Sequence, residues 1–171
     1  MANIILIGMP TCGKSTVGVL LAKQLGYRFL DSDLLIQEQE GRLLHELIAE
    51  RGNDGFLAIE DAVNASINTD RTVIATGGSA VYGARAMEHL KKNGVVVYLK
   101  ISYETLAERL GDYTHRGVVM PAGYTLRDLY DERAALYEQY ADVTLEESLA
   151  AGIGETVVRL AELVGTVKKD S

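Results

Sequence analysis

The sequence predicts an α/β protein in which helices cover both faces of a parallel sheet. Two observations carry this prediction. Short apolar runs alternate with longer helical patterns along the whole chain, and each apolar run stops at a polar or glycine-rich turn. No internal repeat, low-complexity tract or flexible linker interrupts the alternation, so one domain spanning residues 1–171 is expected. Ligands of such sheets bind at the carboxyl ends of the strands, so the turns there are the expected location of a site.

The first strand is expected in the Ile/Leu-rich run 3–7, and the helix after it ends at Gly26, a residue type that commonly terminates helices. The clearest buried strand is 95–101, which begins with three valines. Residues 111–123 contain three glycines and a proline, so an irregular segment is expected there. The remaining strands are expected at 27–30, 71–75 and 143–145, and the helices at 16–25, 34–49 with an interruption near Gly41, 55–68, 84–93, 103–110, 125–140 and 154–164.

The composition is typical of a soluble globular protein, and the net charge of −7 gives no field that attracts nucleic acid or an anionic membrane. No apolar run approaches the ~20 residues that a membrane-spanning helix needs, and the start lacks the basic region of a signal peptide. The single cysteine, Cys12, cannot form an intrachain disulfide, which fits a reducing compartment. We therefore expect a cytoplasmic monomer with no nucleic-acid or membrane partner.

The strongest motif is the run 8–16, Gly-Met-Pro-Thr-Cys-Gly-Lys-Ser-Thr, which matches the phosphate-binding pattern G-x-x-x-x-G-K-[ST]. A strand precedes it and a helix follows it, as required for backbone N–H groups and the positive helix end to bind phosphate oxygens. Lys14 can reach the β- and γ-phosphates, and the Ser15 hydroxyl can ligate Mg²⁺. The alternative is a glycine-rich turn that binds nothing. The motif predicts nucleoside triphosphate contacts from Gly8, Pro10, Thr11, Cys12, Gly13, Lys14, Ser15 and Thr16.

Two carboxylates, Asp31 and Asp33, follow the second expected strand directly. In an extended segment, residues two apart point to the same side, so both can face the phosphate loop. Phosphoryl transfer needs one group to hold Mg²⁺ and another to orient or deprotonate the attacking hydroxyl, and this pair could divide that work. The alternative for Asp31 is an N-cap of the next helix.

Glycines and arginines mark further candidate positions. Gly77 and Gly78 end a strand and leave N–H groups accessible to a substrate hydroxyl or carboxylate, although an ordinary strand-to-helix turn has the same pattern. A basic residue closing over the nucleotide would neutralise charge on the transferred phosphoryl group, although surface arginines are common. The candidates around the irregular segment are Arg109, Arg116, Arg127 and Arg133.

Taken together, these motifs resemble shikimate kinases from about residue 3 to residue 146. The resemblance is carried by residues 8–16, Leu30 to Asp33, Gly41 with Arg42, Phe56 with Glu60, Thr76 to Gly78, Val97 to Leu99, Arg116, and Glu132 to Tyr137. It implies a P-loop NTPase of the nucleoside-monophosphate-kinase-like type, with a five-stranded parallel sheet in three α/β/α layers. It also implies a mobile lid at about 111–123 and an acceptor-binding region at about 33–62.

The same resemblance implies ATP-dependent, Mg²⁺-dependent phosphorylation of shikimate, a step in aromatic amino acid biosynthesis. Lys14 would contact the transferred phosphate, Ser15 and Asp31 would hold Mg²⁺, and Asp33 would bind the acceptor hydroxyls and orient the attacking oxygen. Gly78 would give a backbone contact to the acceptor. Among the arginines, Arg116 would be the lid arginine, Arg109 would stack on adenine and Arg133 would pair with the acceptor carboxylate.

Two departures from the family pattern fall in the acceptor half. Leu57 stands where the family carries an arginine that binds the acceptor carboxylate, and Ser79 stands where it carries a third glycine. The lid reads Arg116-Gly117-Val118 where the family has Arg-Pro-Leu. We expect the acceptor to contact Leu57, Gly77 and Ser79, with its binding altered at Leu57 and Ser79, and Arg42 or Arg51 as possible replacements for the missing charge. A kinase for another sugar, sugar acid or polyol stays an alternative, as does a nucleotide-binding regulator without activity.

Overall fold

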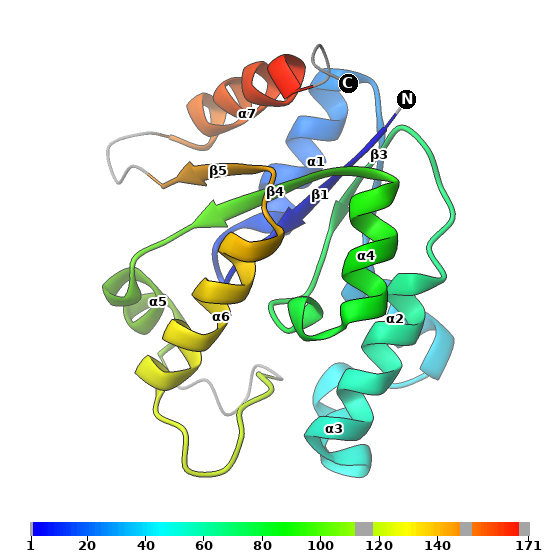
Figure 1. The fold of residues 1–171 in the computed structure, drawn as a ribbon, viewed down its shortest axis with the longest axis vertical. Helices are drawn as coiled ribbons and strands as arrows, with labels where there is room; N and C mark the ends of the chain where they lie inside the picture. Colours follow the sequence, from blue (N-terminus) through cyan, green and yellow to red (C-terminus); the bar gives the residue numbers. More distant parts are fainter. Residues whose placement is uncertain (1, 112–117, 148–151, 168–171) are drawn as a thin grey trace.

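The computed structural model describes residues 2–111, 118–147 and 152–167 (Figure 1). The central strand is β1 (Asn3–Ile7), which pairs with β3 (Thr72–Ala75) on one side and β4 (Gly94–Lys100) on the other. The edges are β2 (Arg28–Asp31), next to β3, and β5 (Val143–Glu146), next to β4. The order is β2-β3-β1-β4-β5 with parallel pairing throughout, so the expected five-stranded parallel sheet is confirmed.

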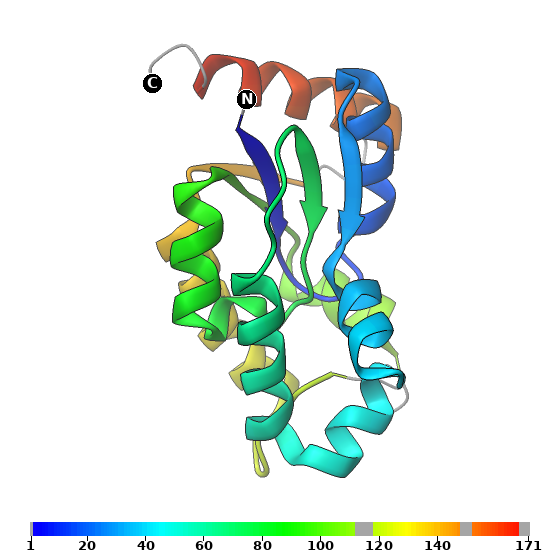
Figure 2. The same cartoon turned by 90° about the vertical axis from the view of Figure 1, so that its right-hand side faces the viewer.

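Helices cover both faces of this sheet, which confirms the three-layer α/β/α prediction (Figure 2). On one face lie α1 and α7, and on the other lie α4 and α6, while α2 and α3 extend beyond the carboxyl ends of the strands. The bounds are α1 (Lys14–Leu25), α2 (Ser32–Glu40), α3 (Leu44–Ala65), the 3₁₀ turn η1 (Ala80–Tyr82), α4 (Ala84–Lys92), α5 (Tyr103–Leu110), α6 (Leu126–Tyr140) and α7 (Ile153–Val167).

The main core lies on the two faces of the sheet because its central strands are apolar on both sides. All five residues of β1 are buried, and Val96 and Val97 of β4 are fully inaccessible. Burying one such aliphatic side chain contributes about 1.5–3 kcal/mol, so this sheet forms a rigid base for its carboxyl edge. A second, smaller cluster holds the projecting helices to the segment after α5 and consists of Ile36, Leu47, Phe56, Val63 and Val119.

The start of α2 differs from the sequence expectation. The strand β2 begins one residue later and continues to Asp31, which pairs in register with Ala75. The helix α2 then begins at Ser32 instead of Leu34, because the Asp31 side chain caps it by accepting from the N–H groups of Asp33 and Leu34. The first turn of α2 is therefore joined to the strand with no intervening loop.

The projecting helices also differ in their lengths. The interruption near Gly41 is confirmed, since this glycine ends α2 in the left-handed conformation. The expected separation between residues 49 and 55 is wrong. There α3 is broken only at Gly52, whose backbone (φ 71°, ψ 176°) is non-helical, and helix continues on both sides. Its end falls at Ala65 and not at residue 68.

Candidate active site

The phosphate-loop motif forms the turn between β1 and α1, where two of its glycines have positive φ angles. At Gly8 (φ 150°) a Cβ atom would lie 2.6 Å from the carbonyl oxygen of Leu99, so no larger residue fits there. Gly13 (φ 87°) is in the left-handed conformation immediately before α1. Thr11 also has a positive φ of 68°, an unusual conformation for a β-branched residue. The backbone of the loop is thus curled as nucleotide binding requires.

Lys14 is buried within this loop, with 7% of its surface exposed. Its ammonium group donates to the carbonyl oxygens of Gly8 at 2.8 Å and Met9 at 2.7 Å. A third contact, at 3.5 Å, joins Nζ to the Cys12 sulfur. These bonds hold a full positive charge at the mouth of the loop, where phosphate oxygens would be attracted.

The Asp31 carboxylate caps α2, as its alternative interpretation predicted, and also contacts the phosphate loop. One carboxylate oxygen, Oδ1, accepts from the N–H of Asp33 at 3.0 Å and so caps α2. The other, Oδ2, accepts from the Ser15 hydroxyl at 2.7 Å. Ser15 and Asp31 therefore present two hard oxygen ligands beside the phosphate loop. Mg²⁺ is commonly held by one or two carboxylates plus substrate phosphates and water, so these residues fit that ion.

Asp33 faces the turn that follows β3. A Cβ atom on Gly77 would lie 2.6 Å from Asp33 Oδ1 and 2.8 Å from Glu60 Oε2, so only glycine lets the two carboxylates converge there. Burial, reinforced by the charge of Asp31 and opposed by that of Lys14, raises the pKa of Asp33 to about 6. A carboxylate with this pKa remains mostly ionised at neutral pH and is more basic than an exposed one.

Gly78 and Arg133 meet at the back of the same turn. A Cβ atom on Gly78 would lie 2.8 Å from the Pro10 ring and 3.0 Å from Arg133 Nη1, so the close approach again requires glycine. The Gly78 carbonyl accepts from the Tyr137 hydroxyl at 2.5 Å. The turn is thereby held between the phosphate loop and α6.

Arg133 is 1% exposed although it carries a charge. Its Nη2 donates to the Val119 carbonyl at 2.7 Å, and its guanidinium lies 5.5 Å from the centre of the Tyr82 ring. Its Nε atom is buried with no hydrogen-bond partner among the described residues, and no carboxylate among them forms an ion pair with it. A buried guanidinium with free donors is suited to bind a carboxylate of a ligand.

These groups line one cavity of about 500 Å³ at the carboxyl edge of the sheet. It contains Lys14, Asp33, Gly77, Gly78 and Arg133, which sequence reasoning singled out, and Pro10, Thr11, Gly13, Ser15, Thr16 and Ser79 line it too. It also contains Glu60, which entered the sequence analysis only as part of a family motif and received no role. The signal that could have identified Glu60 is its position four residues after Phe56, on the same face of α3.

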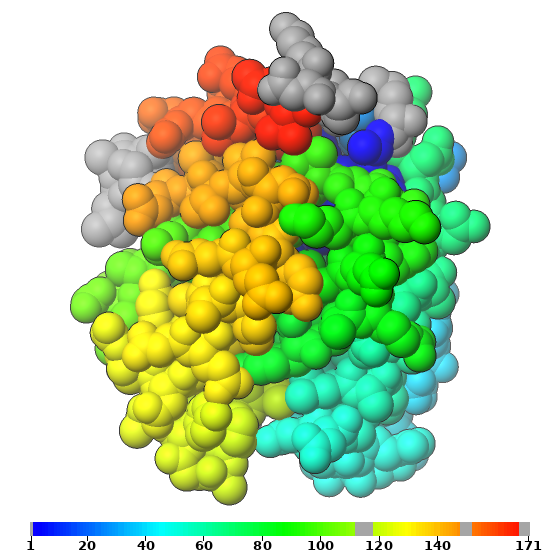
Figure 3. Space-filling model, in the orientation of Figure 1, coloured from blue at the N-terminus to red at the C-terminus, as the bar shows by residue number. Residues whose placement is uncertain are grey.

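Leu57 lies outside this cavity. It lines a neighbouring hollow of about 360 Å³, together with Arg51 and the loop residues Val119 and Pro121. Arg51 and Arg42 each form an ion pair with Glu50 on the exposed surface of α3. Arg51 thus shares the hollow that Leu57 lines, whereas Arg42 lines neither this hollow nor the main cavity. Figure 3 shows the surface of α3 beside that of the 118–125 segment and α6.

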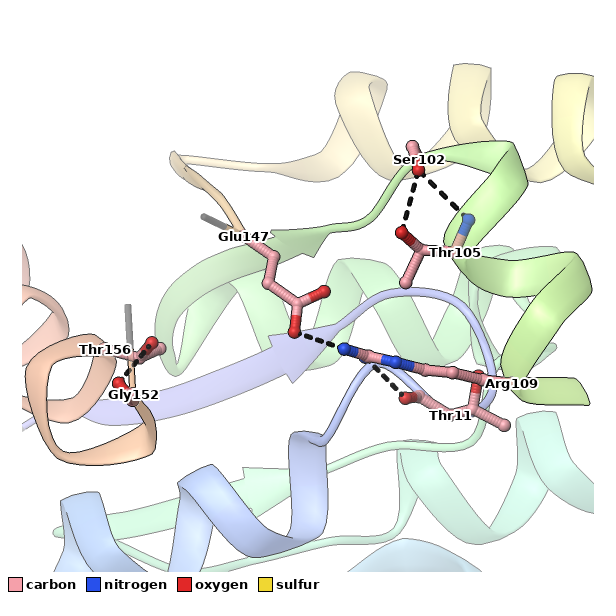
Figure 4. A network of polar contacts seen from close by, with 7 residues as sticks. All are labelled: Thr11, Ser102, Thr105, Arg109, Glu147, Gly152 and Thr156. Atoms are coloured by element: carbon pink, nitrogen blue, oxygen red, sulfur yellow. Dashed lines mark hydrogen bonds and ion pairs between the residues drawn. The ribbon is translucent and has the colours of Figure 1, made fainter. Parts of the chain in front are cut away.

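A second cavity, of about 280 Å³, lies on the other side of the phosphate loop. Arg109 lines it and donates to the Thr11 carbonyl at 3.2 Å and to Glu147 Oε1 at 2.6 Å (Figure 4). Cys12 and Leu99 belong to its lining. The planar guanidinium thus borders a partly apolar space next to the phosphate site, which is what an aromatic base requires. Arg127, a candidate from the sequence, instead lies over the Tyr103 ring and pairs with Asp131.

Arg116 and the rest of residues 112–117 of the expected lid lie outside the described residues. Within the remainder of that segment, Val118 and Val119 line the main cavity and Met120 accepts a hydrogen bond from Asn53 of α3. In the described part of the chain, no helix has both the length and the apolar character needed to cross a membrane.

The fold and this cavity define a P-loop kinase of small molecules, because a phosphate loop, a pair of aspartates and an open cavity meet at one edge of a parallel sheet. The family model for shikimate kinase matches residues 10–161. The chain belongs to the shikimate kinase family.

Individual relatives agree with this assignment. The chain is 38% identical to a shikimate kinase from Thiobacillus denitrificans over 164 residues, which cover 94% of this chain and 90% of that protein. It is 35% identical to one from Clostridium botulinum over 168 residues, covering 98% and 95%. The structure of a shikimate kinase from Acinetobacter baumannii in complex with shikimate has a TM-score of 0.86, with 32% identity and coverage of 98% and 95%. A gluconokinase from Sinorhizobium meliloti, at 20% identity and a TM-score of 0.53, shares the fold alone.

Proposed function

We propose that this kinase transfers the γ-phosphoryl group of ATP to a hydroxyl of shikimate. The observation that carries the proposal is the convergence of Lys14, Asp33 and the buried guanidinium of Arg133 on one cavity. The first two serve phosphoryl transfer, and the third suits an acceptor that carries a carboxylate. A family member whose structure is described in complex with shikimate, 32% identical to this chain, supports the choice of acceptor.

In the proposed reaction the acceptor hydroxyl attacks the γ-phosphorus, the bond from that phosphorus to the β,γ-bridging oxygen breaks, and ADP leaves. Asp33 accepts a hydrogen bond from the attacking hydroxyl and receives its proton as the new P–O bond forms. Lys14 stabilises the negative charge on the phosphoryl oxygens, with its charge already fixed in place by the loop carbonyls. Catalysis is thus a matter of position and electrostatics more than of covalent chemistry.

We assign Mg²⁺ binding to Ser15 and Asp31, because their oxygens lie 2.7 Å apart beside the phosphate loop. The ion would neutralise phosphate charge during transfer. Arg109 is assigned to the adenine base, with the cavity beside Glu147 as its place. Arg133 is assigned to the acceptor carboxylate and Arg116 to the lid.

We further propose that the protein is a cytoplasmic monomer. Its single cysteine and its net charge of −7 support this setting. Light scattering on the eluting peak of a sizing column should give the 18.6 kDa mass of one chain, and a dimer mass would contradict the proposal.

The test is ADP release coupled to a detectable reaction, with ATP, Mg²⁺ and saturating shikimate. Turnover is expected in the wild type and a loss of at least about 100-fold in kcat in Asp33→Asn, since general base catalysis contributes about 10²–10⁴-fold. Asp70→Asn, at an exposed turn before β3, is the matched control and should keep full activity. Wild-type transfer to gluconate but not to shikimate would replace the proposed acceptor by a sugar acid.

The variant Leu57→Arg examines the acceptor half separately. Because Leu57 lies in the neighbouring hollow, we expect Leu57→Arg to lower the KM for shikimate by less than about tenfold and to leave the KM for ATP unchanged. Activity that appears only in Leu57→Arg would mean that the phosphoryl-transfer residues are intact while the natural acceptor is a different molecule.

A further inference from the structure

Glu60 is a buried carboxylate whose hydrogen bonds are only half satisfied. It is 1% exposed and lines the acceptor cavity from α3. Its Oε1 atom accepts from the Ser79 hydroxyl at 2.6 Å. Its Oε2 atom has no hydrogen-bond partner among the described residues, although it is enclosed. A buried, unpaired carboxylate oxygen is costly unless a ligand, a water molecule or a proton satisfies it.

The charged and titratable groups around Glu60 come from five elements. Asp33 approaches it from α2, since Asp33 Oδ1 and Glu60 Oε2 lie 2.6 and 2.8 Å from the same point at Gly77. Arg133 of α6 is the positive charge that lowers the pKa of Glu60. Asp61 follows Glu60 on α3, and its carboxylate accepts a hydrogen bond from the N–H of Ala86. Tyr82 of η1 lies beneath the Arg133 guanidinium. Lys14 of α1 completes the charged lining.

This environment disfavours a negative charge at Glu60. Burial and the charges of Asp33 and Asp61 raise its pKa to about 7, and the Ser79 hydrogen bond and Arg133 only partly oppose them. With both carboxylates ionised, the described charged lining of the cavity is balanced, two cations against Asp33 and Glu60. An anionic acceptor would then add a third negative charge, and the described lining holds no cation beyond Lys14 and Arg133.

We propose that Glu60, oriented by Ser79, takes up one proton when a carboxylate-bearing acceptor binds, and so leaves the charge of Arg133 to the acceptor. The inference rests on the proposed function. The proton comes from solvent, an O–H bond forms at Oε2, and no other bond breaks. The neutral carboxyl group then donates a hydrogen bond from Oε2 within the cavity, which satisfies the atom that lacks a partner. Glu60 is thus a positioning and specificity-determining residue, and the chain-specific Ser79 sets the pH at which it acts.

The sign of the pH dependence follows from the raised pKa. Below about pH 7 Glu60 is already protonated in the free protein, and the affinity for the acceptor is greatest. Above pH 7 each bound acceptor must bring a proton with it, so Kd rises by up to about tenfold per pH unit until the pKa of the complex is reached. The acceptor carboxylate itself titrates near pH 4 and does not contribute in this range.

The experiment is titration calorimetry of the wild-type protein with shikimate at pH 7.5, in two buffers of different ionisation enthalpy. The difference in heat reports the number of protons taken up, which should be roughly one half to one. Glu60→Gln, which keeps the size and a donor, should take up none at this pH and should show a flat Kd from pH 7 to 8.5, a range above the pKa of about 6 of Asp33. Glu88→Gln, at an exposed position of α4, is the matched control and should behave as the wild type.

Ser79→Ala provides a second, independent readout. Because the Ser79 hydroxyl stabilises the ionised form of Glu60, its loss should move the rise in Kd to higher pH, a shift that mere loosening of the cavity would not produce. Unfolding curves and ATP affinity identify any variant that fails to fold. Binding and turnover of shikimate with equal heats in both buffers, or proton uptake that persists in Glu60→Gln, would overturn the inference and leave the proposed function standing. Absence of both binding and turnover in the wild type would overturn both.

Discussion

The nucleotide half and the acceptor half of this active site are built in different ways. The phosphate site is made by one continuous turn, residues 8–16, in which backbone conformation supplies most of the geometry. The acceptor cavity is made by side chains from α2, α3, α6 and the turn after β3, which are far apart in the sequence. Backbone geometry tolerates few substitutions, whereas assembled side chains can be exchanged for others that balance the same charges. This chain's departures, at Leu57 and Ser79, fall in the second half.

The largest effect is expected in the nucleotide half. Lys14→Met should lower kcat by at least about 10²–10³-fold, because it removes the fixed positive charge that stabilises the transferred phosphoryl group. Steady-state rates of ADP release measure the change. Lys23→Met, at an exposed position of the same helix, is the control and should have little effect. A loss below tenfold in Lys14→Met would mean that the nucleotide half does not dominate the rate of phosphoryl transfer.

Arg133→Lys tests the acceptor half. The variant keeps the charge but loses the planar fork, so the KM for shikimate should rise about 10- to 100-fold while the KM for ATP stays the same. Initial rates measured against each substrate in turn separate the two values. An equal rise in both would show that Arg133 serves the fold, or both substrates, and not the acceptor in particular.

Gly77→Ala should disturb the acceptor half, because residue 77 lies next to the carboxylates of Asp33 and Glu60. The new methyl group would lie within 3 Å of both Asp33 and Glu60, so kcat should fall by roughly tenfold as Asp33 is displaced. Gly165→Ala is the matched control, because nothing lies within 4 Å of that position in α7. This control should stabilise the protein by about 0.5–1 kcal/mol in a thermal melt, as expected for alanine in a helix.

The smallest effect is expected at the base of the nucleotide. Arg109→Ala removes contacts to Thr11 and Glu147 that are half exposed, so the KM for ATP should rise only about three- to tenfold. Shikimate binding measured without nucleotide should be unaffected. A change in shikimate affinity would show that the nucleotide cavity and the acceptor cavity are not independent.

The sheet and the phosphate loop could be predicted from the sequence because their signals are local. Apolar runs such as 95–101 predict buried strands, and a contiguous motif predicts a contiguous loop. The proximity of Asp31 to Ser15 could also be predicted, since both lie at the carboxyl ends of parallel strands, which meet at one edge of the sheet.

Three features of the acceptor half could not be predicted in this way. Helix α3 continues across residues 49–55 with Gly52 as its single non-helical residue, and no local pattern in the sequence specifies the conformation of that glycine. The burial of Glu60 depends on helices that are distant in sequence. The hydrogen bond from Ser79 to Glu60 gives the serine at position 79 a structural role. It could be predicted only if the course of α3 and the burial of Glu60 were already known.

The carboxylate of Asp31 connects the first turn of α2 to the start of α1. Its two oxygens are bonded to different partners, the first turn of α2 and the hydroxyl at the start of α1. A displacement of α2 relative to the phosphate loop would therefore stretch one of these two bonds. Because no loop separates β2 from α2, the first turn of the helix, which carries Asp33, is held at a fixed position relative to the strand.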